Sequence, residues 1–184
     1  MMANEVEIKF IVHDLDGIRN RLRELQFKEQ TPRTNEMNTL FDRGAELRNR
    51  GEILRIRKYG DKWTLTHKVK SKNARHKSRV ETETTVADGE ALEQVFRSLG
   101  FEPSFRYEKF RSEWRDGKGH VVIDETPIGN FGEIEGEPNW IDRVAEQIGI
   151  QERDYITKSY GELFSDWKQS HQSDANNMTF AEIR

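Results

Sequence analysis

The sequence has no cysteine among its 184 residues and no long hydrophobic run. The absence of cysteine excludes disulfides and thiolate metal sites, and it fits a reducing cytoplasm. The first ten residues, MMANEVEIKF, contain no apolar signal-peptide core, and no apolar stretch approaches the roughly 20 residues that a membrane-spanning helix needs. We therefore expect a cytoplasmic protein without a membrane partner.

The sequence also lacks an excess of charge of either sign. There are 30 Lys and Arg against 33 Asp and Glu, so the net charge is only −3. A balanced chain produces no long-range basic field, which makes nucleic acid an unexpected partner. Charged residues are nevertheless as common as hydrophobic ones, at 34% each, and that is a high charge load for a globular protein.

Charged and hydrophobic residues alternate over residues 5–10, EVEIKF, as they do in a β-strand. A single stretch of this kind is usually a strand with one solvated face. Four later segments, however, also carry two charged residues two positions apart. Strand-like pairs of mixed sign favour one shared polar interior, which a closed antiparallel barrel provides because alternate residues of every strand point into its lumen. The later pairs are Arg55 and Arg57, Glu81 and Glu83, Lys109 and Arg111, and Glu133 and Glu135.

Helical spacing of hydrophobic residues recurs between the strand-like segments. Asp14 or Asp16 caps a first predicted helix, Asp88 caps a second that ends at Gly100, and Asn139 caps a third over residues 140–148. A last helix begins near Lys158. Beyond Lys168 the chain is polar and poor in hydrophobic residues, so we expect one domain over residues 1–167 and a flexible tail over 168–184.

Further strands are predicted from period-two patterns and turn signals. Residues 34–42 form one strand, and residues 44–51 read as a polar loop. Hairpins follow across the turns at 60–61 and 116–119. The order of strand, helix and strand that begins at Glu5 recurs from Glu81, which suggests two related half-barrels.

A polar interior with this many charges predicts a ligand, because burying the charges without one is expensive and pairing all of them internally would at best roughly break even. Carboxylates without cysteine or histidine partners favour Mg²⁺ or Mn²⁺, and clustered Arg and Lys favour phosphate. A site with both fits a polyphosphate bridged to the protein by divalent metal. The acidic set is Glu5, Glu7, Glu81, Glu83, Asp124, Glu133 and Glu135, and the basic set is Lys9, Arg55, Arg57, Lys68, Lys109, Arg111 and Lys158.

These residues and their order resemble the CYTH superfamily, or triphosphate tunnel metalloenzymes, which contains class IV adenylyl cyclases, thiamine triphosphatases and inorganic triphosphatases. The resemblance implies an α+β fold in which an eight-stranded antiparallel β-barrel of two related halves forms an open tunnel, with helices packed outside. It covers nearly the whole chain up to Trp167. The matching motifs are ExExK (Glu5, Glu7, Lys9), LRIR (Arg55, Arg57), TLTHK (Lys68), RVETE (Glu81, Glu83), EKFRS (Lys109, Arg111), VVIDE (Asp124), GEIEG (Glu133, Glu135) and TKSYGELF (Lys158).

The resemblance also implies roles. It assigns two Mg²⁺ or Mn²⁺ ions to the carboxylates, a triphosphate to the basic residues, and catalysis to Lys9, Lys68 and Lys109. Glu81 and Glu83 either bind a second metal or orient basic side chains. The metal ligands are Glu5, Glu7, Asp124, Glu133 and Glu135, and the triphosphate ligands are Lys9, Arg55, Arg57, Lys68, Lys109, Arg111 and Lys158.

The reaction stays open at this point. The second half of the chain is most similar to the class IV adenylyl cyclase branch, which converts ATP to cyclic AMP and pyrophosphate. A triphosphatase acting on inorganic, thiamine or nucleoside triphosphates shares the same charged positions, and a noncatalytic polyphosphate-binding module is a third hypothesis. The basic run 70–79 is either a solvated loop or a tunnel-mouth loop for an anion, including an RNA 5′-triphosphate. A homodimer is also left open.

Overall fold

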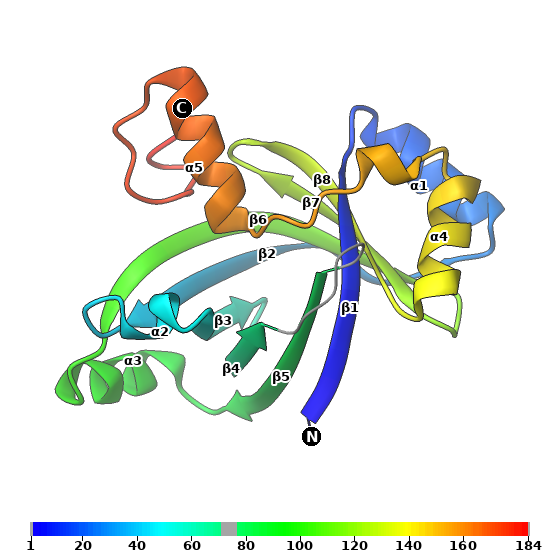
Figure 1. The fold of residues 1–184 in the computed structure, drawn as a ribbon. Helices are drawn as coiled ribbons and strands as arrows, with labels where there is room; N and C mark the ends of the chain where they lie inside the picture. Colours follow the sequence, from blue (N-terminus) through cyan, green and yellow to red (C-terminus); the bar gives the residue numbers. More distant parts are fainter. Residues whose placement is uncertain (1, 71–76, 184) are drawn as a thin grey trace.

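Eight strands form a closed antiparallel barrel in the order β1-β5-β4-β3-β2-β6-β7-β8 (Figure 1). The structure is a computed structural model that describes residues 2–70 and 77–183, with the side chains of residues 6–69 and 80–183. The predicted α+β barrel is confirmed. The strands are β1 (Met2–Ile11), β2 (Lys28–Asp42), β3 (Glu52–Tyr59), β4 (Lys62–Lys70), β5 (Lys77–Val86), β6 (Glu102–Arg115), β7 (His120–Thr126) and β8 (Gly129–Glu135).

The barrel consists of two halves with the same order of elements, apart from one additional short helix between β2 and β3. In each half a strand, a helix and a long strand are followed by two more strands, first from β1 to β4 and then from β5 to β8. Exchanging β1 with β5, β2 with β6, β3 with β7 and β4 with β8 leaves every strand pairing of the closed barrel unchanged. The pairing therefore has a two-fold topological symmetry, as the recurring sequence pattern predicts.

Helices lie around the outside of the barrel (Figure 1). Asp14 and Asp88 cap α1 and α3 as predicted, each accepting two backbone N–H groups. Two details differ from the expectation: a short helix occupies part of the predicted loop 44–51, and α4 begins after Glu137, so Asn139 lies inside it. The helices are α1 (Leu15–Glu24), α2 (Glu46–Asn49), α3 (Gly89–Ser98), α4 (Pro138–Gln147), the 3₁₀ turn η1 (Glu152–Asp154) and α5 (Tyr160–His171).

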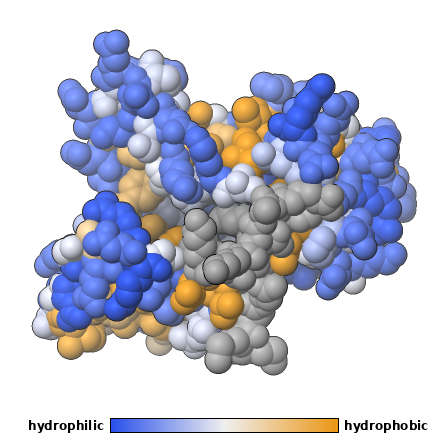
Figure 2. Space-filling model, viewed as in Figure 1, coloured by the Kyte–Doolittle hydropathy of each residue, from blue (hydrophilic) through white to orange (hydrophobic). Residues whose placement is uncertain are grey.

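The main hydrophobic core lies between the barrel wall and the helices α1 and α4. Ile8 and Phe10 point outward from β1 into this core, where they pack with Trp140 and Ile141 of α4. Burying each such side chain contributes about 1.5–3 kcal/mol. Hydrophilic residues cover most of the outward helix surface in Figure 2, and hydrophobic residues show between the helices. Because the apolar side of β1 faces outward, its charged side faces the lumen.

The C-terminal residues pack against β6. Met178 is fully buried, and its backbone exchanges hydrogen bonds with Arg106 and Glu108. Phe180 lies against Phe110, with ring centroids 5.4 Å apart. This part of β6 extends beyond its pairing with β7, so the segment covers backbone groups that would otherwise be unpaired. Part of the segment 168–184, for which a flexible tail is predicted, thus packs against the barrel through Met178.

None of the helices in the described ranges has both the length and the apolar character needed to span a lipid bilayer.

Candidate functional site

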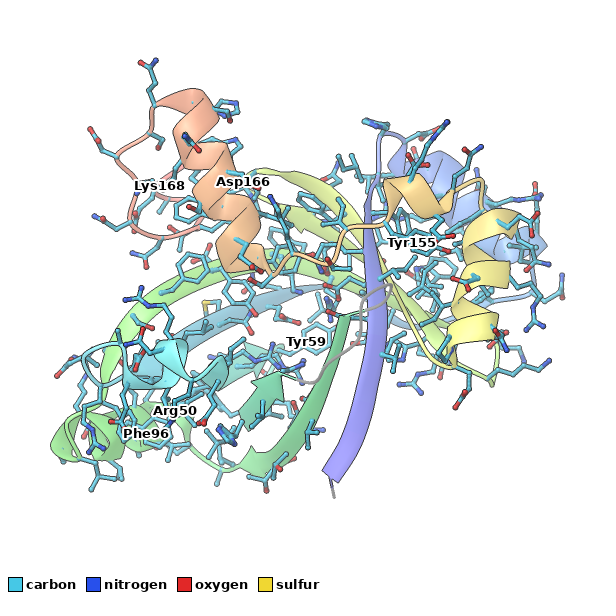
Figure 3. All side chains as sticks on the ribbon, viewed as in Figure 1. Arg50, Tyr59, Phe96, Tyr155, Asp166 and Lys168 are labelled. Carbon is cyan, nitrogen blue, oxygen red and sulfur yellow. The ribbon has the colours of Figure 1, made fainter. Side chains whose placement is uncertain are left out.

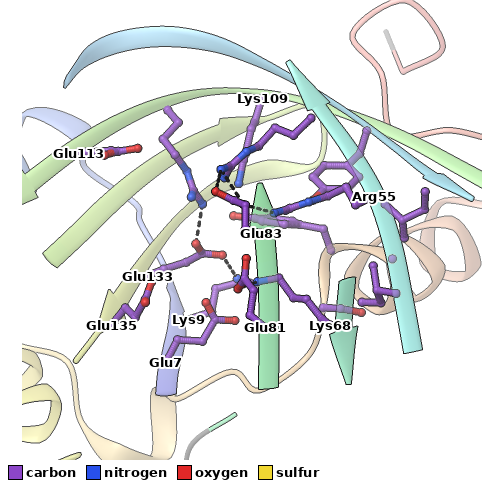
Figure 4. A pocket seen from close by; sticks show the side chains of 18 of the residues that line it. Glu7, Lys9, Arg55, Lys68, Glu81, Glu83, Lys109, Glu113, Glu133 and Glu135 are labelled. Atoms are coloured by element: carbon purple, nitrogen blue, oxygen red, sulfur yellow. Dashed lines mark hydrogen bonds and ion pairs between the residues drawn. The ribbon is translucent and has the colours of Figure 1, made fainter. Parts of the chain in front are cut away.

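The barrel encloses a cavity of about 580 Å³ lined mainly by charged side chains. Figure 4 labels ten of these charged side chains, which reach the shared space from strands on several sides. Among the described side chains that line it, seven are basic and six are acidic. The basic ones are Lys9, Arg55, Arg57, Lys68, Lys109, Arg111 and Arg115, and the acidic ones are Glu7, Glu81, Glu83, Glu113, Glu133 and Glu135.

Strand parity and register bring opposite charges together. In antiparallel pairs, residues directly opposite one another project from the same face of the sheet. Lys9 is opposite Glu133, Lys68 is opposite Glu81, and Arg111 is opposite Asp124. The alternation in the sequence therefore places the charges inside, and the register pairs them.

Asp124 is the most enclosed carboxylate of the predicted set. It is fully buried and is absent from the cavity lining. Arg111 donates to both of its oxygens at 2.7 and 2.6 Å, Lys109 Nζ donates at 2.9 Å, and Tyr160 Oη donates at 2.5 Å. Four hydrogen bonds occupy both oxygens, so Asp124 anchors two cations of the cavity wall.

Glu133 is held in a similar way by two cations. It forms ion pairs with Lys9 and Arg111. Burial alone would raise the pKa of Glu133, but the charges of Lys9 and Arg111 outweigh burial and keep this pKa well below its usual range. The ammonium of Lys9 also lies 4.4 Å from the centre of the Tyr160 ring, which fixes its position further.

The opposite wall carries the pairs from β3, β4 and β5. Arg57 donates to Glu83 at 3.1 Å, and Lys68 forms an ion pair with Glu81 at 2.7 Å. Arg55 donates to Tyr107 Oη at 3.2 Å, whereas its Nε has no hydrogen-bond partner among the described residues. Arg55 also lines the cavity, where its positive charge suits an anionic ligand.

Carboxylates for a metal gather along β1 and β8. Glu7 is opposite Glu135, Glu133 is the next inward residue of β8, and all three line the cavity (Figure 4). Such oxygen donors suit Mg²⁺ or Mn²⁺ chemically. Within the described ranges, no three acidic or histidine side chains already converge on one point as a metal site does. The side chain of Glu5, which follows the same parity, lies outside the described residues.

The profile of the CYTH domain matches residues 3–160. The chain belongs to the CYTH family. It is 29% identical over 170 residues to a Methanocaldococcus jannaschii protein named "Putative adenylate cyclase MJ0240", covering 86% of this chain and 97% of that protein.

Solved structures with the same fold include a Vibrio parahaemolyticus protein, which superposes with a TM-score of 0.79. The two sequences are 20% identical, and the match covers 90% of this chain and 99% of the Vibrio chain. Another is the Hippeastrum protein HpAC1, which is described as having a dominant triphosphatase activity. Its TM-score is 0.65, its sequence is 20% identical, and the match covers 90% of this chain and 96% of the HpAC1 chain.

Two predicted site positions of this CYTH protein lie away from the cavity lining. Lys158 is largely exposed and forms an ion pair with Asp166 of α5, which Figure 3 labels on the helix. Asp124 lies behind the wall, as described above. Of the basic run 70–79, residues 71–76 and all the side chains lie outside the described residues.

Two further residues near the cavity were not singled out by the sequence analysis. Glu36 is a fully buried carboxylate facing Lys109 and Arg111. Tyr160, the first residue of α5, reaches Asp124, and burial followed by the nearby carboxylate charges raises the pKa of its phenol well above the usual value. Glu36 and Asn38 flank the hydrophobic Met37, as Lys109 and Arg111 flank Phe110, so parity was a usable signal for Glu36. Tyr160 lies within the matching motif TKSYGELF, but nothing local in the sequence indicates its contact with Asp124.

Proposed function

We propose that this CYTH protein is a divalent-metal-dependent enzyme that processes a nucleoside triphosphate inside the barrel. The observation that carries the proposal is the set of seven Lys and Arg side chains that line the cavity. Guanidinium and ammonium groups in such numbers suit the oxygens of a polyphosphate.

The balance of charge favours a triphosphate that carries its own metal. Seven basic and six acidic side chains leave the described lining almost neutral. A polyphosphate alone would bind against the repulsion of the carboxylates and therefore more weakly, whereas its complex with divalent cations would satisfy both sets. Glu7, Glu133 and Glu135, with Glu5, would hold Mg²⁺ or Mn²⁺, which supplies charge neutralisation on the phosphate oxygens. The proposal extends to two ions.

An apolar end of the cavity favours an organic triphosphate over an inorganic one. Leu40, Ile53, Phe105 and Tyr107 line the cavity together. Leu40 is directly opposite both Arg55 and Phe105 in the strand register, so the apolar end adjoins the cations. This arrangement supports a planar, partly apolar base placed next to the triphosphate.

In the cyclase reaction, the ribose 3′-oxygen attacks the α-phosphorus and pyrophosphate leaves. Arg55 and Arg57 would bind phosphate oxygens, and Lys9, Lys68 and Lys109 would stabilise the charge that moves onto pyrophosphate. The ion pairs of these lysines with carboxylates keep them in position before substrate arrives. We place adenylyl cyclase first because of the M. jannaschii relative's name and the apolar end of the cavity.

Hydrolysis of the γ-phosphate is the second candidate. The same cations would serve it, and HpAC1, which shares the fold, is described with a dominant triphosphatase activity. Chromatography of products formed from ATP and, separately, from inorganic triphosphate under Mg²⁺ and Mn²⁺ distinguishes the two. Cyclic AMP with pyrophosphate supports the cyclase, whereas phosphate release that is fastest from inorganic triphosphate supports the triphosphatase.

Substitutions test the proposed division of roles. Glu135→Gln, or Glu5→Gln, should abolish metal-dependent turnover while the melting temperature stays within a few degrees, because it removes a cation ligand at constant volume. Arg57→Ala should raise KM as well as lower kcat, because it acts through substrate binding. Near wild-type activity in both glutamine variants would show that the metal site is elsewhere, and tight triphosphate binding without turnover in the wild type would indicate a noncatalytic module.

A further inference from the structure

Glu36 of β2 is a buried carboxylate that none of the roles above uses. Its side chain is fully buried, and its carboxylate lies 3.4 Å from Lys109 Nζ and 3.8 Å from Arg111 Nε. Asn38 Nδ2 donates to Oε1 at 2.9 Å, while Oε2 has no hydrogen-bond partner among the described residues. Glu36 therefore differs from Asp124, whose oxygens are both taken by direct hydrogen bonds from cations.

The cations around Glu36 favour its ionised form. Burial would raise its pKa, but the charges of Lys109, Arg111, Arg57 and Arg55 together hold this pKa below its usual range. At neutral pH the carboxylate is thus ionised beneath four of the cations proposed to bind triphosphate. It makes few of the hydrogen bonds by which a structural ion pair normally offsets desolvation.

We infer that Glu36 is an internal counter-anion that weakens the cavity's affinity for polyphosphate and so permits release of the anionic product. This inference rests on the proposed function. Pyrophosphate or phosphate is itself a polyanion, and the cations that bind the substrate would also retain the product. A fixed negative charge a few ångströms from those cations repels every anion in the cavity, and the buried position reduces its screening by salt.

The alternative role for Glu36 is purely positional, in which it holds Lys109 and Arg111 in place for the substrate. The two roles predict opposite signs. If Glu36 only positions the cations, removing its charge disorders them and weakens anion binding. If Glu36 is a counter-anion, removing its charge strengthens anion binding.

Calorimetric titration with inorganic triphosphate, and separately with pyrophosphate, in EDTA measures that sign without any catalytic step. Glu36→Gln should bind both anions at least about tenfold more tightly than wild type, since one removed charge at this range is worth more than one tenfold step in affinity. Asn38→Asp, which adds a charge beside Glu36, should bind them more weakly. Glu29→Gln, an exposed change on the same strand, is the matched control and should match wild type.

Equal or weaker binding by a folded Glu36→Gln would overturn the inference. If that variant fails to fold, as judged by its melting curve, Asn38→Asp decides, and wild-type affinity in it would also overturn the inference. Absence of triphosphate binding by the wild type, with or without metal, would instead reject the proposed function itself.

Discussion

Replacing Asp124 by Asn should destabilise the protein strongly even without metal or substrate. The change keeps the volume but removes the charge that accepts hydrogen bonds from Lys109, Arg111 and Tyr160. Removing one partner of a buried ion pair typically costs 3–5 kcal/mol because the other charge stays buried. Glu36 remains near both cations, so we expect the lower end, about 3 kcal/mol.

Urea unfolding in EDTA, followed by tryptophan fluorescence, measures this effect. With a denaturant slope of about 2 kcal/mol per molar, the midpoint should fall by about 1.5 M. Tyr160→Phe removes a single donor to the same carboxylate and should cost about 1.5–3 kcal/mol. Asp61→Asn, in the exposed turn between β3 and β4, is the control and should change the free energy of unfolding by no more than about 0.5 kcal/mol.

The anchoring role of Asp124 would be refuted by a loss below about 1 kcal/mol in EDTA together with a large loss of metal affinity. That pair of results would return Asp124 to the metal-ligand role that the sequence resemblance implies.

Three other predictions concern stability. Folding lowers the pKa values of Glu36 and Glu133, so the unfolded chain binds more protons than the folded one as the pH falls through about 4.5. The urea midpoint should therefore drop over this pH range. A midpoint that stays constant from pH 7 to 3.5 would contradict this prediction. Gly132→Ala should lower stability by about 1–3 kcal/mol, measured by urea unfolding, because the added Cβ would lie 2.1 Å from the buried ring of Phe10. Met178→Ala should cost at least about 2 kcal/mol in the same assay, whereas an unchanged midpoint would mean that the C-terminal segment does not pack.

Much of the barrel could be predicted from short-range pattern. Period-two alternation around Lys9 and Arg55 fixes which side of each strand is charged, and it does so without knowledge of the strand order. Helix caps such as Asp14 are equally local, since the side chain bonds to N–H groups two and three residues ahead. These features need only neighbouring residues.

The parts that the sequence analysis missed depend on distant contacts. Tyr160 becomes part of the site only because α5 brings it to Asp124, 36 residues earlier in the chain. Residues 172–183 look like a tail by composition, yet β6 offers Met178 an open strand edge to pair with. Lys158 illustrates the converse, because its basic character suits the cavity, yet its side chain is largely exposed and pairs with Asp166.

In the proposed function, the charged barrel interior turns over a nucleoside triphosphate with divalent metal. Phosphorus NMR of ATP incubated with the purified protein tests it most directly, first in EDTA and then after addition of excess Mg²⁺ or Mn²⁺. We predict that the ATP signals persist in EDTA and that pyrophosphate appears together with cyclic AMP once metal is added. An ATP spectrum unchanged under both metals, at protein concentrations that bind inorganic triphosphate, would contradict the account.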